Sequence, residues 1–239
     1  GKPLVLHEQN SVAGMANKVL AGVADRVFTA FPNVFRKAQW VGNPLRAEFL
    51  NQPDPVTRFA GRSGPLHLLV VGGSLGAKAL NEVVPQALAL LPKEQRPRVL
   101  HQSGATQIDA LRANYQAAGV VAELTPFIDN TAQAFADADL VICRAGASTV
   151  TEIAAVGAAA VFVPFPSAVD DHQTTNARFL ADNGGGRVLL QRDLTAAALA
   201  EILQKQERNT LMAQGLAAKK MQKTGATEAV VAACEELSA

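Results

Sequence analysis

The stretch that decides the fold is LHLLVVGGSLGAKALN, residues 66–81. It opens with a short, continuous apolar run, which is typical of a strand buried on both faces of a parallel sheet. A glycine-rich turn at 72–77 follows, and the apolar spacing after it predicts a helix over 77–91. A strand, a tight turn and a helix in immediate succession indicate the start of a βαβ unit.

The same alternation extends along the chain in both directions. We expect strands at 3–7, 26–30, 66–72, 98–102, 120–125, 140–144, 159–164 and 187–190, and helices at 77–91, 106–118, 149–156, 171–183, 196–204 and 226–237. Residues 51–65 (NQPDPVTRFAGRSGP) contain three prolines and no periodic apolar pattern, which predicts a linker. Upstream, residues 1–45 are then the tail of one α/β unit. Residues 66–190 hold at least five strands and predict a Rossmann-like, doubly wound parallel sheet.

Composition excludes several classes of protein. The 239 residues carry 22 Lys and Arg against 21 Asp and Glu, a net charge of +1, which argues against a nucleic-acid binder. The two cysteines, Cys143 and Cys234, form no CxxC pair, so a zinc site or disulfide framework is not expected and a reducing compartment fits best. The longest apolar run, 153–163, is shorter than the roughly 20 residues of a membrane span. We expect a soluble, cytoplasmic chain that begins inside a larger protein, since it opens on a strand without a starting Met.

Two polar clusters follow predicted strands and open predicted helices, where parallel sheets bind ligands. In the first, at 72–77, glycines let the backbone approach a phosphate, the helix N-terminus attracts it, and Ser74 could add its hydroxyl. The alternative is a tight turn with Ser74 as N-cap. In the second, at 143–149, Ser148 and Glu152 share a helix face, and the Glu152 carboxylate could accept both hydroxyls of a ribose. The alternative is a capping box with Ser148 or Thr149 as N-cap and Glu152 in the first turn.

Other polar groups have both a functional and a structural explanation. Residues 164–176 contain Asp and Gln side chains suited to sugar hydroxyls, although Asp170 or Asp171 could simply cap a helix and leave His172 on the surface. The cluster 7–10 (HEQN) ends a strand, where a turn is the alternative. Asp137-Ala138-Asp139 matches the DxD pattern of metal sites, but it precedes a strand, so we expect a helix-to-strand turn. Basic residues near the C-terminus predict a solvated helix face, with contact to anionic lipid as the alternative; these are Lys205, Arg208, Lys219, Lys220 and Lys223.

Taken together, the motifs resemble one family over essentially the whole chain. They are HEQN (7–10), VGNPLR (41–46), VVGGSLGAKALN (70–81), HQSG (101–104), FIDN (127–130), CRAGASTVTEIAAVGAAAVFVPFP (143–166) and DHQTTNA (171–177). This set is similar to the MurG family of peptidoglycan glycosyltransferases. The resemblance implies a GT-B fold of two Rossmann-like domains. It also implies transfer of N-acetylglucosamine from UDP-N-acetylglucosamine to undecaprenyl-pyrophosphoryl-N-acetylmuramyl-pentapeptide, which converts lipid I to lipid II.

The resemblance also assigns roles by motif position. Asn10 would face the donor sugar, Arg46 would reach the uracil or phosphate region, and Ser74 would bind diphosphate. Ile128 would offer backbone groups to uracil, and Gln173 would hydrogen-bond the sugar. The segment that would hold diphosphate and ribose, with Glu152 on the ribose diol, comprises Ala147, Ser148, Thr149, Val150, Thr151 and Glu152. The family implies no metal and no cofactor, and a peripheral position on the cytoplasmic side of the bacterial cell membrane.

The resemblance implies three regions in the chain. Residues 1–45 would be the C-terminal part of the acceptor domain, 46–224 the donor-nucleotide domain, and 225–239 a helix that returns to the first domain. The family's GGTGGH loop, its membrane patch and its candidate general base have no counterpart here; His7 is the nearest candidate base, and Thr174 replaces the second glutamine of a D-x-Q-Q segment. The isolated chain would then be inactive alone. A non-hydrolysing UDP-sugar epimerase and a non-catalytic UDP-sugar-binding module are the alternative functions.

Overall fold

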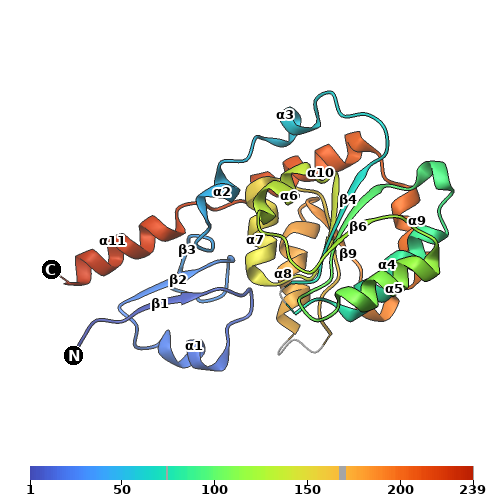
Figure 1. Ribbon diagram of the computed structural model, residues 1–239. Coiled ribbons are helices and arrows are strands. Elements are labelled where there is room, and N and C mark those ends of the chain that lie inside the picture. Colours follow the sequence, from blue (N-terminus) through green and yellow to red (C-terminus); the bar gives the residue numbers. More distant parts are fainter. Residues whose placement is uncertain (74, 167–170, 239) are drawn as a thin grey trace.

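The computed structural model describes residues 1–73, 75–166 and 171–238, and within them the strands form two parallel sheets (Figure 1). The smaller sheet has the order β1-β2-β3, with β1 at Val5–Glu8, β2 at Arg26–Thr29 and β3 at Gln39–Trp40. The larger sheet has the order β6-β5-β4-β7-β8-β9. Its strands are β4 (His67–Val71), β5 (Arg98–Gln102), β6 (Glu123–Thr125), β7 (Leu140–Cys143), β8 (Ala160–Phe162) and β9 (Gly186–Val188).

The order of the larger sheet reverses at its centre. Strand β4 is the first of the six along the chain; its Leu68 pairs with Val99 of β5 on one side and with Leu140 of β7 on the other. Chain connections therefore run outward in both directions from the β4–β7 pair, which is the topological switch point of a doubly wound sheet. The predicted fold class is confirmed, and the switch point indicates where a ligand should bind.

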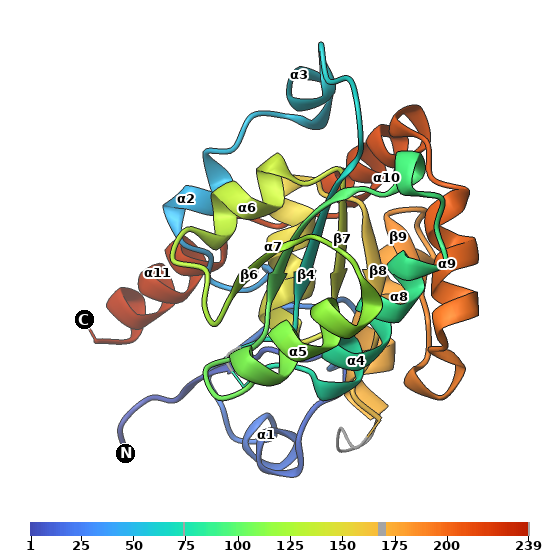
Figure 2. The same ribbon diagram turned by 45° about the vertical axis from the view of Figure 1, so that its right-hand side comes forward.

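Helices cover both faces of the larger sheet (Figure 2). On one face lie α4 (Lys78–Ala89), α5 (Ile108–Ala118) and α9 (Ala196–Gln204), and on the other α6 (Thr131–Asp137), α7 (Ala147–Val156) and α8 (His172–Ala181), with α10 (Arg208–Lys220) packed against α7. Successive residues of β4 enter opposite cores, since Leu68 and Val70 pack with α4 and Leu69 packs with α6 and α7. Burial on both faces explains why these strands lack a polar-apolar alternation.

The last helix, α11 (Ala226–Ser238), lies beside the small sheet rather than the large one (Figure 1). Its Ala226 and Ala233 are buried against Phe28 and Val41. Arg26 of β2 also forms an ion pair of 2.5 Å with Glu236 of this helix. The C-terminal helix thus packs against the sheet formed by the N-terminal residues.

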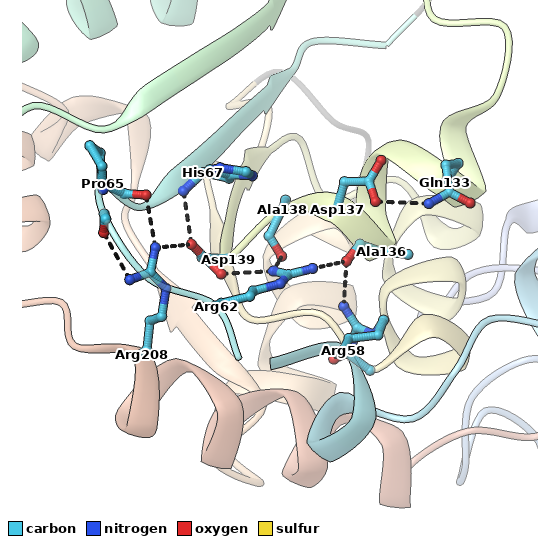
Figure 3. A network of polar contacts seen from close by, with 12 residues as sticks. Arg58, Arg62, Pro65, His67, Gln133, Ala136, Asp137, Ala138, Asp139 and Arg208 are labelled. Carbon is cyan, nitrogen blue, oxygen red and sulfur yellow. Dashed lines mark hydrogen bonds and ion pairs between the residues drawn. The ribbon is translucent and has the colours of Figure 1, made fainter. Parts of the chain in front are cut away.

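The segment 51–65 is more ordered than the linker that its prolines predict. It contains α3 (Pro55–Phe59), whose N-cap residue Asp54 accepts a hydrogen bond of 3.0 Å from the Thr57 N–H. Arg58 donates to the Ala136 carbonyl at the end of α6 (Figure 3). It also donates to the carbonyl oxygens of Val156 and Gly157 at the end of α7. The linker prediction did not include this helix, because the arginine contacts that hold the segment are long-range and leave no local apolar period.

Asp139 lies at the centre of a buried ion-pair cluster (Figure 3). Its fully buried carboxylate pairs with Arg62 at 2.7 Å and with Arg208 of α10 at 3.2 Å, and it accepts the His67 N–H at 2.9 Å. The Asp137-Ala138-Asp139 segment connects α6 to β7 at the amino ends of the strands, so the expected helix-to-strand turn is confirmed. The cluster anchors segment 51–65 and α10 to the sheet.

The basic residues near the C-terminus do not form the single solvated face that we expected. Arg208 pairs with Asp139, Lys219 donates to the Ala155 carbonyl, and the Lys223 ammonium lies 4.5 Å from the centre of the Trp40 ring. Lys205 remains at the surface, where it pairs with Glu201. Among the described helices, none combines the length and the apolar character that crossing a bilayer requires.

Candidate functional site

A cleft lies at the switch point of the larger sheet. The loop after β4 and the loop after β7 are neighbours because these two strands pair directly. With Phe165 and Gln173 they line a cleft of about 700 Å³, which includes residues 71–73 and 75–79 on one side and Arg144, Gly146 and Thr149 on the other. The first two polar clusters of the sequence therefore meet, as parallel pairing requires.

Two helix N-termini border this cleft. Helix α4 begins at Lys78 with Ala77 as N-cap, and α7 begins at Ala147 with Gly146 as N-cap. Within the described residues, neither N-terminus is capped by a side chain. Free backbone N–H groups and the positive ends of two helix dipoles make this edge attractive to an anion.

The capping-box alternative for the second cluster is wrong. Gly146 occupies the N-cap position, so Ser148 and Thr149 lie inside the first turn and Glu152 lies beyond it. Ser148 is exposed, while Thr149 lines the cleft. The Glu152 carboxylate is consequently not needed to hold the start of α7.

A smaller pocket of about 160 Å³ adjoins the cleft and shares Val71, Gly73 and Thr149 with it. Its remaining lining residues are Gln102, Phe127, Ile128, Thr131, Phe135 and Glu152. Aromatic and aliphatic side chains dominate this pocket, and one carboxylate stands beside them. Such a lining suits a planar base together with a hydroxyl-bearing group.

Burial raises the pKa of Glu152, and the nearby Arg46 guanidinium acts in the opposite direction. Arg46 precedes α2 (Ala47–Leu50), where its guanidinium lies 5.0 Å from the centre of the Phe49 ring. The structure thus brings together Glu152 and Arg46, which are far apart in the sequence. A partly desolvated carboxylate gains from hydroxyl donors that replace lost water.

Gln173 of α8 connects the loops on the far side of the cleft. Its Oε1 accepts the Ala145 N–H at 3.3 Å and the Phe165 N–H at 2.9 Å. These contacts fix the orientation of the amide, so the NH₂ group is what Gln173 can offer a ligand. Arg144 holds the same loop, since it donates to the carbonyl oxygens of Val163 and Pro164.

Asn176 connects the HEQN cluster to the cleft. Its Nδ2 donates to Asn10 Oδ1 at 3.3 Å and to the Ala145 carbonyl at 3.2 Å, while its Oδ1 accepts from the backbone and hydroxyl of Ser11. Asn10 is therefore held against the loop that precedes α7.

The other polar residues of HEQN have structural partners. The buried Glu8 carboxylate accepts from the Asn10 and Gly14 N–H groups and from Asn17 Nδ2. His7 Nε2 lies 2.9 Å from the Gly42 carbonyl oxygen. Because a carbonyl only accepts, this nitrogen carries a proton, and only Nδ1 of the neutral ring could accept one.

Several predicted residues take positions that limit what their side chains can do. Val150 is fully buried in the core, and the Thr151 hydroxyl donates to the Ala147 carbonyl at 3.0 Å. Ala147 is buried and lies in the first turn of α7, so it could contribute only its backbone. Ser74 and Asp170 lie outside the described residues, so their predicted roles stay predictions. Asp171 occupies the N-cap position of α8 without a side-chain bond to the helix backbone.

The two pockets also contain residues that the sequence analysis did not identify, among them Lys78 and Gln102. Lys78 lines the cleft at the start of α4, and Gln102 lines the smaller pocket. Gln102 Nε2 donates to the carbonyl oxygens of Gly73 and Pro126, which joins two loops around the pocket. Gln102 could have been identified from the sequence, because it is a polar residue at the end of the buried strand β5. In the described part of the chain, no three His, Cys, Asp or Glu side chains gather to hold a metal ion.

Comparison with known proteins assigns the family. Residues 67–233 match the glycosyltransferase family 28 C-terminal domain, which accounts for more than half of the chain. The chain belongs to glycosyltransferase family 28. Its larger sheet is therefore that of a GT-B glycosyltransferase.

Individual relatives agree with the resemblance seen in the sequence. A UDP-N-acetylglucosamine--N-acetylmuramyl-(pentapeptide) pyrophosphoryl-undecaprenol N-acetylglucosamine transferase from Polaromonas sp. is 79% identical, with all of this chain aligned to 62% of that protein. The protein of the same name from Paracidovorax citrulli is 74% identical over all of this chain and 67% of its own length. The crystal structure of Acinetobacter baumannii MurG has a TM-score of 0.90 at 42% identity, covering 99% of this chain and 67% of that one. The chain thus spans about two thirds of the length of these relatives.

Proposed function

We propose that this chain forms the donor-binding part of a transferase that moves N-acetylglucosamine from UDP-N-acetylglucosamine to undecaprenyl-pyrophosphoryl-N-acetylmuramyl-pentapeptide. The observation that carries the proposal is the pair of adjoining pockets at the switch point, one bordered by two uncapped helix N-termini and the other containing Glu152. The names of the relatives support the choice of donor and acceptor.

The donor would lie across both pockets. Uracil would occupy the smaller pocket beside the Ile128 backbone, and the ribose hydroxyls would donate to Glu152. The diphosphate would lie over the residues that the two pockets share, within reach of the α4 and α7 N-termini. The sugar would then extend toward Gln173 and Asn10, with Arg46 near the nucleoside.

The chemistry would be one displacement at the anomeric carbon, which inverts an α-linked donor to a β-linked product. A muramyl hydroxyl attacks, its proton passes to a base, and UDP departs with both electrons of the broken bond. Charge that develops on the β-phosphate would be stabilised by the two helix N-termini, without a metal ion. We place the base outside this chain, in the acceptor region of the whole protein, as the family resemblance implies. His7 Nε2 is committed to the Gly42 carbonyl, so Nδ1 is the one nitrogen of His7 left for that role.

The domain division and location follow the same proposal. Residues 1–45 with the helix 225–239 would belong to the acceptor domain, and 46–224 would form the donor domain. The packing of α11 on the small sheet supports this division. The whole protein would act as a peripheral protein on the cytoplasmic side of the cell membrane.

We expect UDP and UDP-N-acetylglucosamine to bind the chain in the presence of EDTA. Helix N-termini and backbone groups supply the phosphate contacts, so a divalent cation is not needed. Isothermal titration with and without Mg²⁺ measures this directly. Binding that appears only after Mg²⁺ is added would overturn the metal-independent account.

We also expect the chain alone to bind donor without consuming it, and to support transfer once the acceptor region is supplied in trans. Product analysis by chromatography distinguishes the alternatives. An epimerase would convert the UDP-sugar without any acceptor, and a pure binding module would stay inactive even with the acceptor region present.

A further inference from the structure

A chain of buried hydrogen bonds runs beneath the loop that follows β4. It begins at His101 on β5, which is fully buried. Its Nδ1 lies 3.0 Å from the Tyr115 hydroxyl, and its Nε2 lies 3.0 Å from Asn81 Oδ1. Burial lowers the pKa of His101 to about 3, so the ring is neutral, with one donor and one acceptor nitrogen.

The direction of each bond in this chain is determined by its partners. Asn81 Nδ2 donates to the Ser103 carbonyl at 3.1 Å, so Asn81 must present its oxygen to His101. His101 Nε2 therefore carries the proton, and Nδ1 accepts from the Tyr115 hydroxyl. Asn81 Nδ2 also donates to Gln107 Oε1 at 3.0 Å, which leaves the Gln107 NH₂ group to donate to the Leu75 carbonyl at 2.8 Å.

The last hydrogen bond of this series is to the loop that borders the cleft. Gln107 holds the Leu75 carbonyl, and Gln102 from the end of β5 holds the Gly73 carbonyl at 2.9 Å. Gly76 has a φ of +75°, and a β-carbon there would clash with the Ser103 carbonyl. The loop thus rests directly on the segment 101–104, without room for a side chain at this contact.

This arrangement has an electrostatic consequence. Carbonyl oxygens repel a phosphate, so a loop that binds anions must turn them away from the ligand. Here two carbonyls of the loop are held by amide donors. Asn81 and Gln107 line a neighbouring cavity between α4 and α5, which shares Lys78 and Glu82 with the cleft. Neither residue lines the cleft itself, so we expect both to act on the ligand through the loop.

We propose that Asn81, His101 and Gln107 are positioning residues that hold the loop after β4 in the form that binds the diphosphate of the nucleotide. This inference rests on the proposed function, since it concerns the same site. It predicts that these hydrogen bonds contribute to affinity for UDP but not to affinity for uridine, which lacks phosphates.

The test uses Gln107→Met in the 239-residue chain. Methionine keeps the length of the side chain, adds no charge and removes the donor to Leu75. It also removes the acceptor for Asn81 Nδ2, which keeps its bond to the Ser103 carbonyl, so one of the two lost bonds is to the loop. We expect the Kd for UDP to rise about three- to tenfold, the effect of one hydrogen bond, while the Kd for uridine changes less than about twofold. Gln116→Met, at an exposed position of α5, the helix that Gln107 precedes as N-cap, is the matched control and should leave both values unchanged.

A second variant guards against a local artefact. His101→Phe keeps the ring volume and removes the donor that fixes Asn81, so it should also weaken UDP more than uridine, with folding checked by thermal unfolding. If Gln107→Met changes the Kd for UDP and the Kd for uridine equally, or changes neither, this inference is overturned while the proposed function stands. If the unaltered chain binds neither UDP nor uridine in calorimetric titration, the inference and the proposed function both fail.

Discussion

Replacing Glu152 with Gln should weaken UDP binding about ten- to a hundredfold, because two charge-assisted hydrogen bonds to the ribose hydroxyls become weaker neutral ones. Uridine should lose affinity by the same factor, since it carries the same ribose. Isothermal titration of both ligands measures the effect. Affinity of the unaltered chain should also fall as the pH approaches the raised pKa of Glu152 from above, because the protonated carboxyl no longer accepts two hydroxyls.

The stability of the ligand-free Glu152→Gln variant provides the control. Burial raises the pKa of Glu152 above its ordinary value of 4.5, so the folded chain favours the protonated form more than the unfolded chain does. Stability associated with that proton is present below pH 4.5 and is lost as the pH rises through the raised value. At pH 7 the amide should therefore leave the free energy of unfolding unchanged or slightly higher. A well-folded variant with unaltered uridine affinity would show that Glu152 does not contact the ribose.

Asp139→Asn should lower the free energy of unfolding by about 2–4 kcal/mol. The carboxylate is fully buried and pairs with Arg62 and Arg208, so its removal leaves two arginines without their acceptor charge. We place the value below the full cost of breaking a buried pair because the arginine side chains are 19% and 21% exposed. Denaturant unfolding measures the change.

Asp137→Asn is the matched control for this substitution. It changes the same residue type two positions earlier, where the side chain is exposed and accepts from Gln133 at 2.8 Å, a bond that Asn preserves. Its free energy of unfolding should change by less than about 0.5 kcal/mol. A similar loss in both variants would mean that the ion-pair cluster does not anchor segment 51–65.

The sheet strands could be predicted because their apolar runs are local signals. All eight predicted strands are present, with ends shifted by a few residues, and among the strands of residues 1–73, 75–166 and 171–238 only the two-residue β3 was missed. The missed helices are α1, α2, α3, α6 and α10. Four of them are seven residues or shorter, too short for a helical period to emerge. Helix α10 contains Gly215, whose role is tertiary: a β-carbon there would clash with the Gly157 carbonyl of the neighbouring segment.

The sequence predicted which loops form the candidate site, because strand order determines that, but it did not predict the side-chain contacts within the site. Loops that follow β4 and β7 were expected to bind ligands, and their meeting follows from parallel pairing. The approach of Arg46 to Glu152 and the support of the loop by Gln107 depend on tertiary packing between distant segments. The capping alternative failed for a local reason, since Gly146 takes the N-cap position that this alternative gave to Ser148 or Thr149.

A crystal structure of the chain with UDP-N-acetylglucosamine and EDTA tests the central claim most directly. The account predicts uracil beside Ile128, ribose hydroxyls on Glu152, and the diphosphate at the N-termini of α4 and α7. Nucleotide density at another place would contradict it, for example in the groove at the amino ends of β4 and β5 that is lined by His67, Arg98 and Glu123. An empty switch-point cleft at saturating donor concentration would contradict it equally.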